Sequence, residues 1–267
     1  ASGPRRDPFE VGRRVAELEV DAAVVVAPTR WGPRRVVPGA VVGGRAVGLV
    51  QADAPGELPP AGGGDGGSPG DPGTAPAAPW VVAAMAKDVF LEPTDHWAGT
   101  LEAAGRPTVD ARADRARRDD LVAILRAGPG VVLYAGHGRT RGWSGYQGLR
   151  WRHLRPAAPE RPRPAGVVVA FACDTLKRAR SRVDFGTRLV GAGMARAYLG
   201  AVGSIRTADA EALSGIVVDH LARREGPATL VGLLPAVDRA VAADPAARRA
   251  WRSFRLLGDP TAPVGRG

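Results

Sequence analysis

The sequence predicts an α/β fold in three layers, in which a mostly parallel sheet carries helices on both faces. Short apolar runs rich in Val, Ala and Leu alternate with segments of helical character from residue 80 onward. This alternation is typical of buried parallel strands that are joined by crossover helices. The chain has 267 residues, 45% of them hydrophobic, and can therefore bury a substantial core.

The expected elements follow one another without an internal repeat. Strands are predicted at 80–85, 106–110, 131–134, 167–172 and 197–202. Helices are predicted at 95–104, 115–126, 185–192, 209–224, 228–242 and 246–254. Gly128 closes the second of these helices, as glycine often does at a helix C-terminus.

The first 79 residues have a different character. A tail is expected at 1–9, a short helix at 10–18, a strand at 20–27 and a β-hairpin within 36–50. Residues 52–79 are almost all Gly, Pro, Ala, Asp and Ser, which bury too little apolar surface to offset the cost of ordering. We therefore expect a β-rich segment at 1–51 that packs on or extends the core, a disordered linker or loop at 52–79, and the main domain at 80–267.

Composition limits the classes of partner. The formal net charge is +10, but the Arg residues are scattered and aromatic residues make up only 5%, so no specific nucleic-acid surface is expected. No apolar run approaches the roughly 20 residues that cross a bilayer, so no membrane partner is expected. The N-terminus lacks a signal-peptide core, which favours a cytoplasmic location. Because the sequence does not begin with Met, other domains or regulatory partners upstream of Ala1 stay an open alternative.

Two of the predicted strands end in a reactive side chain. Cys173, the only cysteine, follows the strand at 167–172, and His137 follows the strand at 131–134 within Ala-Gly-His-Gly. Because the carboxyl ends of parallel strands share one edge, the thiol and the imidazole are expected to meet there. A neighbouring imidazole lets a thiol become a thiolate near neutral pH, so the spacing predicts a Cys–His dyad.

Other interpretations of these residues stay open. A lone cysteine is often a small core hydrophobe. His96 and His220 fall within predicted helices, which leaves His153, in a basic loop, as the one substitute for His137. One Cys and four scattered His give no spacing for a metal site, so neither a metal nor a cofactor is expected.

Four segments together resemble a known family. They are 134–138 (YAGHG), 172–175 (ACDT), 197–201 (AYLGA) and 254–261 (FRLLGDPT), with Trp143 and Gly145 in a polar segment between the first two. In this order they resemble the caspase-like (clan CD) cysteine peptidases, most closely the gingipain-type and CHAT-type bacterial branch. The resemblance covers about residues 80–264 and implies a caspase-like fold for the main domain.

The resemblance implies a cysteine endopeptidase acting on a protein or peptide. Cys173 would attack the peptide carbonyl, His137 would protonate the leaving amine, and the backbone N–H groups of Gly138 and Cys173 would form the oxyanion hole. One well-placed donor of this kind is worth about 3–4 kcal/mol. The resemblance further suggests that Asp88 orients His137. Trp143, Ser204, Ile205 and Arg206 would contact the substrate, and no cofactor is implied, although calcium sometimes accompanies the family.

Asp95 decides the expected specificity. If Asp95 lies at the floor of the S1 pocket, it would select Arg or Lys at P1, the substrate residue before the scissile bond. Alternatively, Thr94-Asp95 is an N-cap of the following helix. If Arg206 pointed into the pocket instead, an acidic P1 residue would be preferred.

The linker at 52–79 has no Lys or Arg, whereas the loop at 176–184 has four. The hypothesis is that an Arg-specific enzyme spares its linker and processes itself in this loop, and the alternative is a solvated basic loop. A catalytically silent caspase-like scaffold module stays open, because Asp174-Thr175 replaces the small residues often seen after the cysteine. A small-molecule acyl transferase or hydrolase would use the same dyad.

Overall fold

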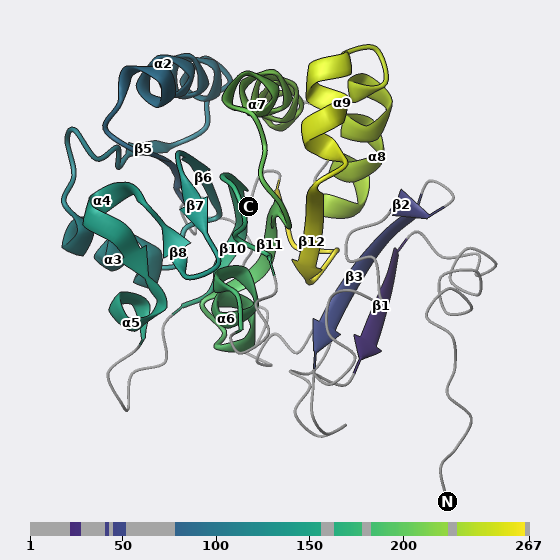
Figure 1. Ribbon diagram of the computed structural model, residues 1–267, viewed down its shortest axis with the longest axis horizontal. Coiled ribbons are helices and arrows are strands. Elements are labelled where there is room, and N and C mark those ends of the chain that lie inside the picture. Colours follow the sequence, from purple (N-terminus) through teal and green to yellow (C-terminus); the bar gives the residue numbers. More distant parts are fainter. Residues whose placement is uncertain are drawn as a thin grey trace, which may run out of the picture.

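A six-stranded sheet forms the centre of the computed structural model (Figure 1). Residues 78–155, 163–177, 183–223 and 229–264 are described in full, together with the backbone of 22–27, 41–42 and 45–51. The strand order is β12-β11-β10-β6-β4-β5, and only β12 is antiparallel to its neighbour. The strands are β4 (Trp80–Ala84), β5 (Thr108–Asp110), β6 (Val131–Ala135), β10 (Ala165–Phe171), β11 (Ala195–Ala201) and β12 (Phe254–Gly258).

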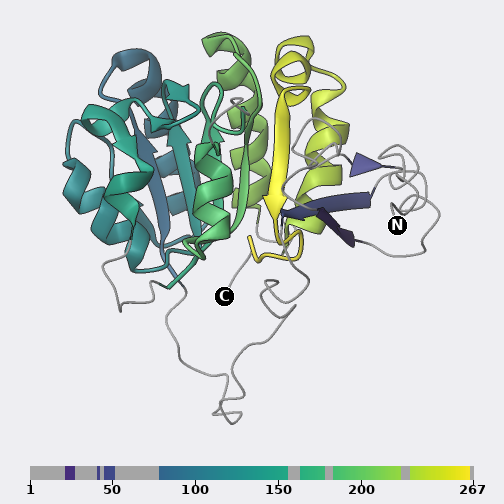
Figure 2. The ribbon, with the colours of Figure 1, turned by 60° about the horizontal axis from the view of Figure 1, so that its bottom comes forward.

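Helices cover both faces of this sheet (Figure 2). One face packs against α2 (Asp88–Ala103), α7 (Thr207–Ala222), α8 (Leu230–Val241) and α9 (Pro245–Trp251). The other face packs against α3 (Arg118–Arg126), α5 (Trp151–Leu154) and α6 (Phe185–Gly191). The expected three-layer arrangement with a mostly parallel sheet is confirmed.

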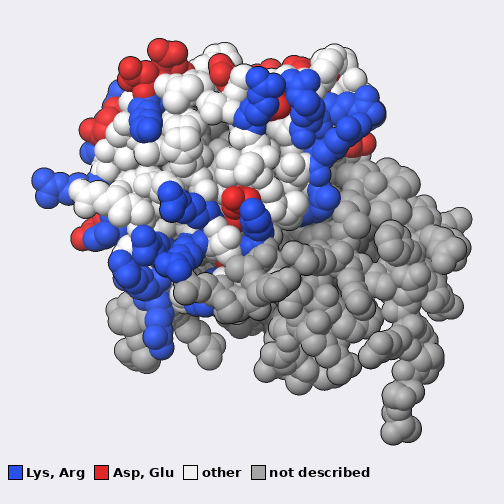
Figure 3. All heavy atoms as spheres, in the orientation of Figure 1, with Lys and Arg blue, Asp and Glu red and all other residues white. Residues whose placement is uncertain are grey.

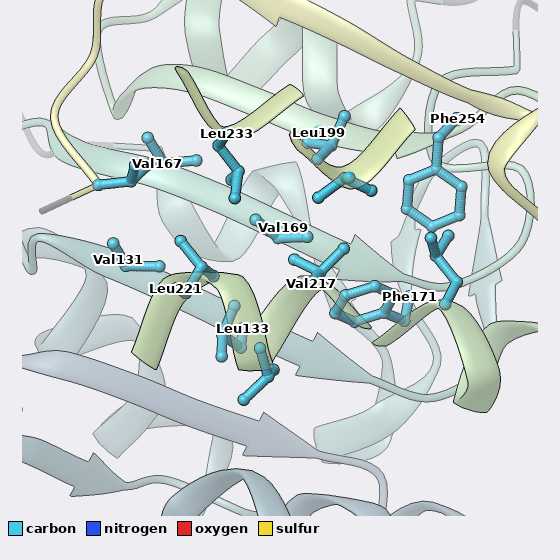
Figure 4. Packing of buried hydrophobic residues seen from close by; sticks show 14 of the residues in the cluster. Val131, Leu133, Val167, Val169, Phe171, Leu199, Val217, Leu221, Leu233 and Phe254 are labelled. Atoms are coloured by element: carbon cyan, nitrogen blue, oxygen red, sulfur yellow. The ribbon is translucent and has the colours of Figure 1, made fainter. Parts of the chain in front are cut away.

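The alternation of side chains along each strand divides the core into two clusters. Leu133 and Val169 point to the α2 and α7 side, where Leu221 and Leu233 meet them (Figure 4). Their neighbours in the sequence, such as Val132, point to the opposite side. Because successive residues of a strand face opposite ways, both layers need apolar partners, which explains why these strands are continuous apolar runs.

Smaller elements follow β6 at the carboxyl edge of the sheet. The strands β7 (Gly138–Arg139), β8 (Gly142–Trp143) and β9 (Leu149–Arg150) form an antiparallel sheet, and α4 (Gly145–Gly148) lies between the last two. These elements could not be predicted from the sequence, because strands of two residues carry no periodicity.

The N-terminal strands form a separate sheet in the order β1-β3-β2. They are β1 (Ala22–Ala27), β2 (Val41–Val42) and β3 (Arg45–Gln51). The antiparallel pair β2–β3 confirms the predicted hairpin, and β1 runs parallel to β3. In Figures 1 and 2, β3 lies beside β12. The expected tail at 1–9, the helix at 10–18 and nearly all of the linker at 52–79 lie outside the described residues.

The predicted start of the first helix of the main domain is wrong. Helix α2 begins at Asp88 rather than at residue 95 and continues through Pro93. A proline inside a helix removes one backbone donor, which is why the sequence suggested a boundary there. Asp95 therefore lies within the helix, and its interpretation as an N-cap is wrong. Thr94 instead donates its hydroxyl to the carbonyls of Phe90 and Leu91.

Charged side chains are distributed unevenly over the surface. On the face shown in Figure 3, Asp and Glu gather over α2, whereas Lys and Arg gather over the region of α9. None of the helices that the structure describes is both long and apolar enough to cross a membrane.

Candidate active site

The register of two neighbouring strands places Cys173 and His137 at one edge of the sheet. Strands β6 and β10 are parallel, and Ala135 is paired with Phe171. His137 and Cys173 each follow these paired residues by two positions. Paired strands lie about 4.8 Å apart, and residues two positions apart extend toward the same face. Both side chains therefore continue the face that α2 and α7 cover.

The thiol of Cys173 is held by the segment that follows β11. The backbone N–H of Ile205 donates to Sγ at 3.4 Å, and Sγ lies 3.5 Å from the carbonyl oxygen of the same residue. The N–H of Asp174 donates to the carbonyl of Gly203 at 3.1 Å. Asp174 adopts a left-handed φ of +59°, which bends the chain sharply after the cysteine. Cys173 is half-buried, so its sulfur is fixed in place but not enclosed in the core.

The loop of His137 is fixed through its backbone. The carbonyl of His137 accepts hydrogen bonds from the N–H of Ser144 at 2.8 Å and the hydroxyl of Tyr134 at 3.2 Å. The imidazole is exposed and meets the ring of Phe90 edge-on, with 5.1 Å between the ring centroids. Among the described residues, no side chain forms a hydrogen bond with this imidazole. Asp88, exposed at the first position of α2, therefore forms no hydrogen bond with the ring.

Phe90 is a site residue that was not predicted from the sequence. Its ring is 7% exposed and lies between the core and the imidazole. Phe90 lies in the first turn of α2 because the helix starts at Asp88. A helix that starts at residue 95, as the sequence predicted, leaves Phe90 outside it.

Gly138 brings the two strand ends into direct contact. A Cβ atom at Gly138 would collide with the carbonyl oxygen of Cys173 and would lie 2.8 Å from Cγ2 of Thr175 and 2.9 Å from Cβ of Ala172. Only glycine therefore fits between the histidine loop and the cysteine turn without displacing one of them. The backbone of residue 138 lies directly beside the turn that carries the thiol.

A layer of aromatic side chains lies beneath the site. Trp143 is 1% exposed, stacks on Tyr134 with 4.1 Å between ring centroids, and donates from Nε1 to the hydroxyl of Tyr198 at 3.3 Å. The hydroxyl of Tyr134 also accepts from the N–H of Gly145 at 3.2 Å. Burial raises the pKa values of Tyr134 and Tyr198 well above the usual range, so both hydroxyls keep their protons. The structure places Trp143 as a support under the loop, where its indole is not open to a substrate.

A groove opens beside this site, between α2 and α7. It is a shallow groove with a cavity volume of about 20 Å³, and it is open to solvent. Its lining includes Phe90, Trp97, Ala135, Phe171, Thr207 and Glu211. Ala135 and Phe171 precede His137 and Cys173 by two residues, and Thr207 follows Ile205 by two. The groove therefore starts where the three segments of the site converge.

The family model of peptidase family C25 matches residues 75–265, a span that includes the whole of this site. The chain belongs to peptidase family C25. It is a caspase-like (clan CD) peptidase of the cysteine type, as the sequence motifs predicted. A comparison with curated proteins found no match.

Solved structures of other peptidases share the fold. The Arg-specific cysteine proteinase gingipain R superposes with a TM-score of 0.70 at 13% identity, over 96% of this chain and 68% of that chain. The complex of the Porphyromonas gingivalis RgpB pro- and mature domains gives a TM-score of 0.69 at 12% identity, over 96% of this chain and 69% of that chain. A further structure, described as a protease, gives 0.64 at 12% identity, over 96% and 67%.

In this C25 peptidase, Asp95 is engaged by another residue. Its carboxylate is paired with Arg112, whose side chain is only 3% exposed. The same guanidinium donates to both carboxylate oxygens of Asp110, at 2.8 and 2.6 Å. Partial burial would raise the pKa of Asp110, but the hydrogen bonds and charge of Arg112 outweigh it and lower the pKa. Asp95 does not line the groove, and its charge is balanced by Arg112.

The other predicted contact residues lie in the loop before α7. Ser204 and Arg206 are exposed, and Arg206 is the N-cap residue of α7. Neither lines the groove, so the structure does not bring Arg206 into it. Ile205 contributes through its backbone, which contacts the thiol. Within the described residues, no three His, Cys, Asp or Glu side chains cluster as a metal site would require.

Proposed function

We propose that this C25 peptidase is an endopeptidase in which Cys173 and His137 act as a dyad on protein or peptide substrates. The observation that carries the proposal is the contact between the two strand ends. The register pairs Ala135 with Phe171, and Gly138 packs against the backbone of Cys173. A nucleophile and a base on adjacent strand ends, with solvent above them, suit attack on an extended peptide.

The residues divide the reaction between them. His137 accepts the proton of the Cys173 thiol, and the sulfur forms a bond to the scissile carbonyl carbon. The C–N bond then breaks as His137 passes this proton to the leaving amine. Water then attacks the thioester, releases the carboxylic acid and regenerates the thiol. The N–H groups of Gly138 and Cys173 would stabilise the oxyanion in both steps. The exposed imidazole has room to serve both the thiol and the leaving amine.

We also propose that the enzyme prefers Arg or Lys at P1 and processes itself in the loop at 176–184. This loop contains Lys177, Arg178, Arg180 and Arg182, whereas 52–79 contains no Lys or Arg. Residues 178–182 lie outside the described residues. A solved relative is a complex of pro- and mature domains, and a regulatory partner of that kind is proposed here as well.

A thiol-directed probe tests the dyad, because Cys173 is the only cysteine. The probe is a peptidyl acyloxymethyl ketone with Arg at P1, and intact-mass spectrometry measures the labelling. The wild type should be labelled rapidly and should hydrolyse members of a peptide library, whereas Cys173→Ala should do neither. Slow labelling, comparable to that of a free thiol, together with no hydrolysis would overturn the proposal and indicate a silent scaffold module.

Self-processing has a separate test. Purified wild type and Cys173→Ala are incubated alone and then mixed, and the products are identified by mass spectrometry. Cleavage within 176–184 in the wild type, but not in Cys173→Ala alone, is the expected result. An intact chain in a preparation that cleaves peptides would contradict this part of the proposal.

A further inference from the structure

The groove between α2 and α7 runs away from the dyad, along the two helices. Both helices start at the carboxyl edge of the sheet, after β4 and β11, and run side by side along the same face (Figure 1). Phe90 and Thr207 in their first turns lie next to the dyad, while Trp97 and Ser214 line the groove two turns further. A side chain that entered from the scissile bond would therefore pass down between the two helices.

The walls of this groove are mainly apolar. Phe90, Trp97 and Phe171 are each less than 8% exposed, so their rings are held rigidly by the core. Val89 at the rim is 48% exposed, one of two large hydrophobic residues that are exposed in the described part of the chain. Such walls favour a substrate side chain with a long hydrocarbon stem, which would cover apolar surface that is otherwise exposed to water.

One carboxylate lies along these walls. Among the described residues that line the groove, Glu211 alone carries a charge. Glu211 lies four residues after Thr207, which places it on the same face of α7 and about 6 Å further along the helix. The four-carbon stem of Lys, or the stem and guanidinium of Arg, can span this depth.

The Glu211 carboxylate is available for a ligand. No cation of the described residues is paired with it, in contrast to Asp95, which pairs with Arg112. The neighbouring hydroxyl of Ser214 donates to the Glu211 carbonyl at 2.7 Å, so this hydroxyl is occupied by the backbone. Figure 3 shows Asp and Glu over α2, the opposite wall, and Lys and Arg over the region of α9, so the charge that a ligand in the groove would meet at closest range is that of Glu211.

We infer that Glu211, rather than Asp95, is the specificity-determining carboxylate that receives the ammonium or guanidinium of a basic P1 residue. The inference rests on the proposed endopeptidase function. The aromatic walls contact the hydrocarbon stem, and Glu211 supplies the charge-assisted hydrogen bond. An acidic P1 residue would be repelled by the same carboxylate.

The test compares peptides that differ only at P1, with Arg, Lys, norleucine or Glu, on the wild type and on Glu211→Gln. Loss of the carboxylate should lower kcat/KM for Arg and Lys by about tenfold or more, as expected for a hydrogen bond to a charged group. Hydrolysis of the norleucine peptide should change less than about threefold, because the apolar walls are intact. The charge reversal Glu211→Lys should make Glu a better P1 residue than Arg.

Glu92→Gln is the matched control, since it removes the same charge from an exposed position on α2 that does not line the groove. Its ratio of Arg to norleucine hydrolysis should equal that of the wild type. Circular dichroism and thermal unfolding check that the exposed Glu211 variants fold. Added salt should reduce the Arg preference of the wild type more than that of Glu211→Gln.

The outcomes separate the two proposals. Wild type that cleaves peptides but keeps its Arg-to-norleucine ratio in Glu211→Gln overturns the inference and leaves the endopeptidase function standing. A wild type that prefers norleucine to Arg at P1 would likewise overturn the inference and leave the endopeptidase function standing. Wild type that hydrolyses no peptide and is not labelled at Cys173 overturns both.

Discussion

The two strand ends that form the site are held in different ways. At Cys173 the side chain itself is fixed, because the backbone N–H of Ile205 donates to the sulfur at 3.4 Å. At His137 only the backbone is fixed, by hydrogen bonds from Ser144 and Tyr134 to its carbonyl. Its imidazole is exposed and contacts the edge of Phe90.

This difference matches the work that each group would do. A nucleophile needs one position, since attack requires close alignment with the scissile carbonyl. A proton carrier has to reach first the thiol and then the leaving amine, so freedom of its ring is useful. The fold thus fixes the nucleophile through its side chain and positions the base only through its loop.

Removal of the imidazole gives the largest expected effect after loss of the thiol. His137→Ala should lower kcat/KM for peptide hydrolysis by about a thousandfold, within the range for a lost general acid–base. His153→Ala is the control, because His153 lies in α5 and binds the backbone N–H of Arg150. Steady-state kinetics with a cleavable peptide measure both. A large loss in His153→Ala, with near-normal activity in His137→Ala, would show that the roles are reversed.

A methyl group at Gly138 tests the contact between the two ends. Its Cβ would collide with the carbonyl of Cys173, so one strand end must move. Because a misplacement of about 1 Å in an active site can cost about a hundredfold in rate, kcat of Gly138→Ala should fall by about that factor. Gly99→Ala, on α2 with open space around the added atom, should keep wild-type activity. If Gly138→Ala were as active as Gly99→Ala, the strand ends would not need this close approach.

The hydroxyl of Tyr134 tests whether the loop of His137 must be held. Tyr134→Phe removes a hydroxyl that joins the carbonyl of His137 to the N–H of Gly145. Tyr146→Phe is matched, because its buried hydroxyl also joins two backbone groups, the N–H of Ala84 and the carbonyl of Ala111. Each variant leaves a buried group unpaired and should lower the free energy of unfolding by about 1–3 kcal/mol.

Activity should separate these two tyrosine variants. Only Tyr134→Phe removes one of the two hydrogen bonds that hold the carbonyl of His137, so its kcat should fall by about tenfold while that of Tyr146→Phe stays near wild type. Urea unfolding and peptide kinetics on the same preparations measure both effects. Equal losses of activity would mean that the hydroxyl acts through general stability instead of through the position of His137.

Most of the sheet could be predicted from the sequence because its strands are buried on both faces. Strands β6 and β10 end within one residue of their predicted ends. The small strands β7–β9 could not be predicted, because two residues show no periodicity. Strand β12 escaped assignment since its five residues were noted only as a motif of the family.

The site was predictable where strand ends define it and not where helices meet. Cys173 and His137 follow from the strand pattern, whereas the groove unites α2, α7 and β10, whose approach depends on core packing. The two carboxylates considered for the specificity site, Asp95 and Glu211, illustrate the difference. With the start of α2 misplaced by seven residues, Asp95 was expected at the entry to the helix, facing a pocket. Nothing in the sequence marks Glu211, inside the helix predicted at 209–224, as a site residue.

Asp95→Asn gives the smallest expected effect and sharpens the contrast with Glu211. Asp95 is 63% exposed, so its ion pair with Arg112 is weak, and its loss should cost less than about 1 kcal/mol. Arg112 keeps its two hydrogen bonds to Asp110, which limits the loss further. The ratio of Arg to norleucine hydrolysis should stay at the wild-type value, because Asp95 does not line the groove. If this ratio fell by tenfold in Asp95→Asn and held in Glu211→Gln, Asp95 would be the specificity carboxylate, and Arg112 would have to release it when the substrate binds.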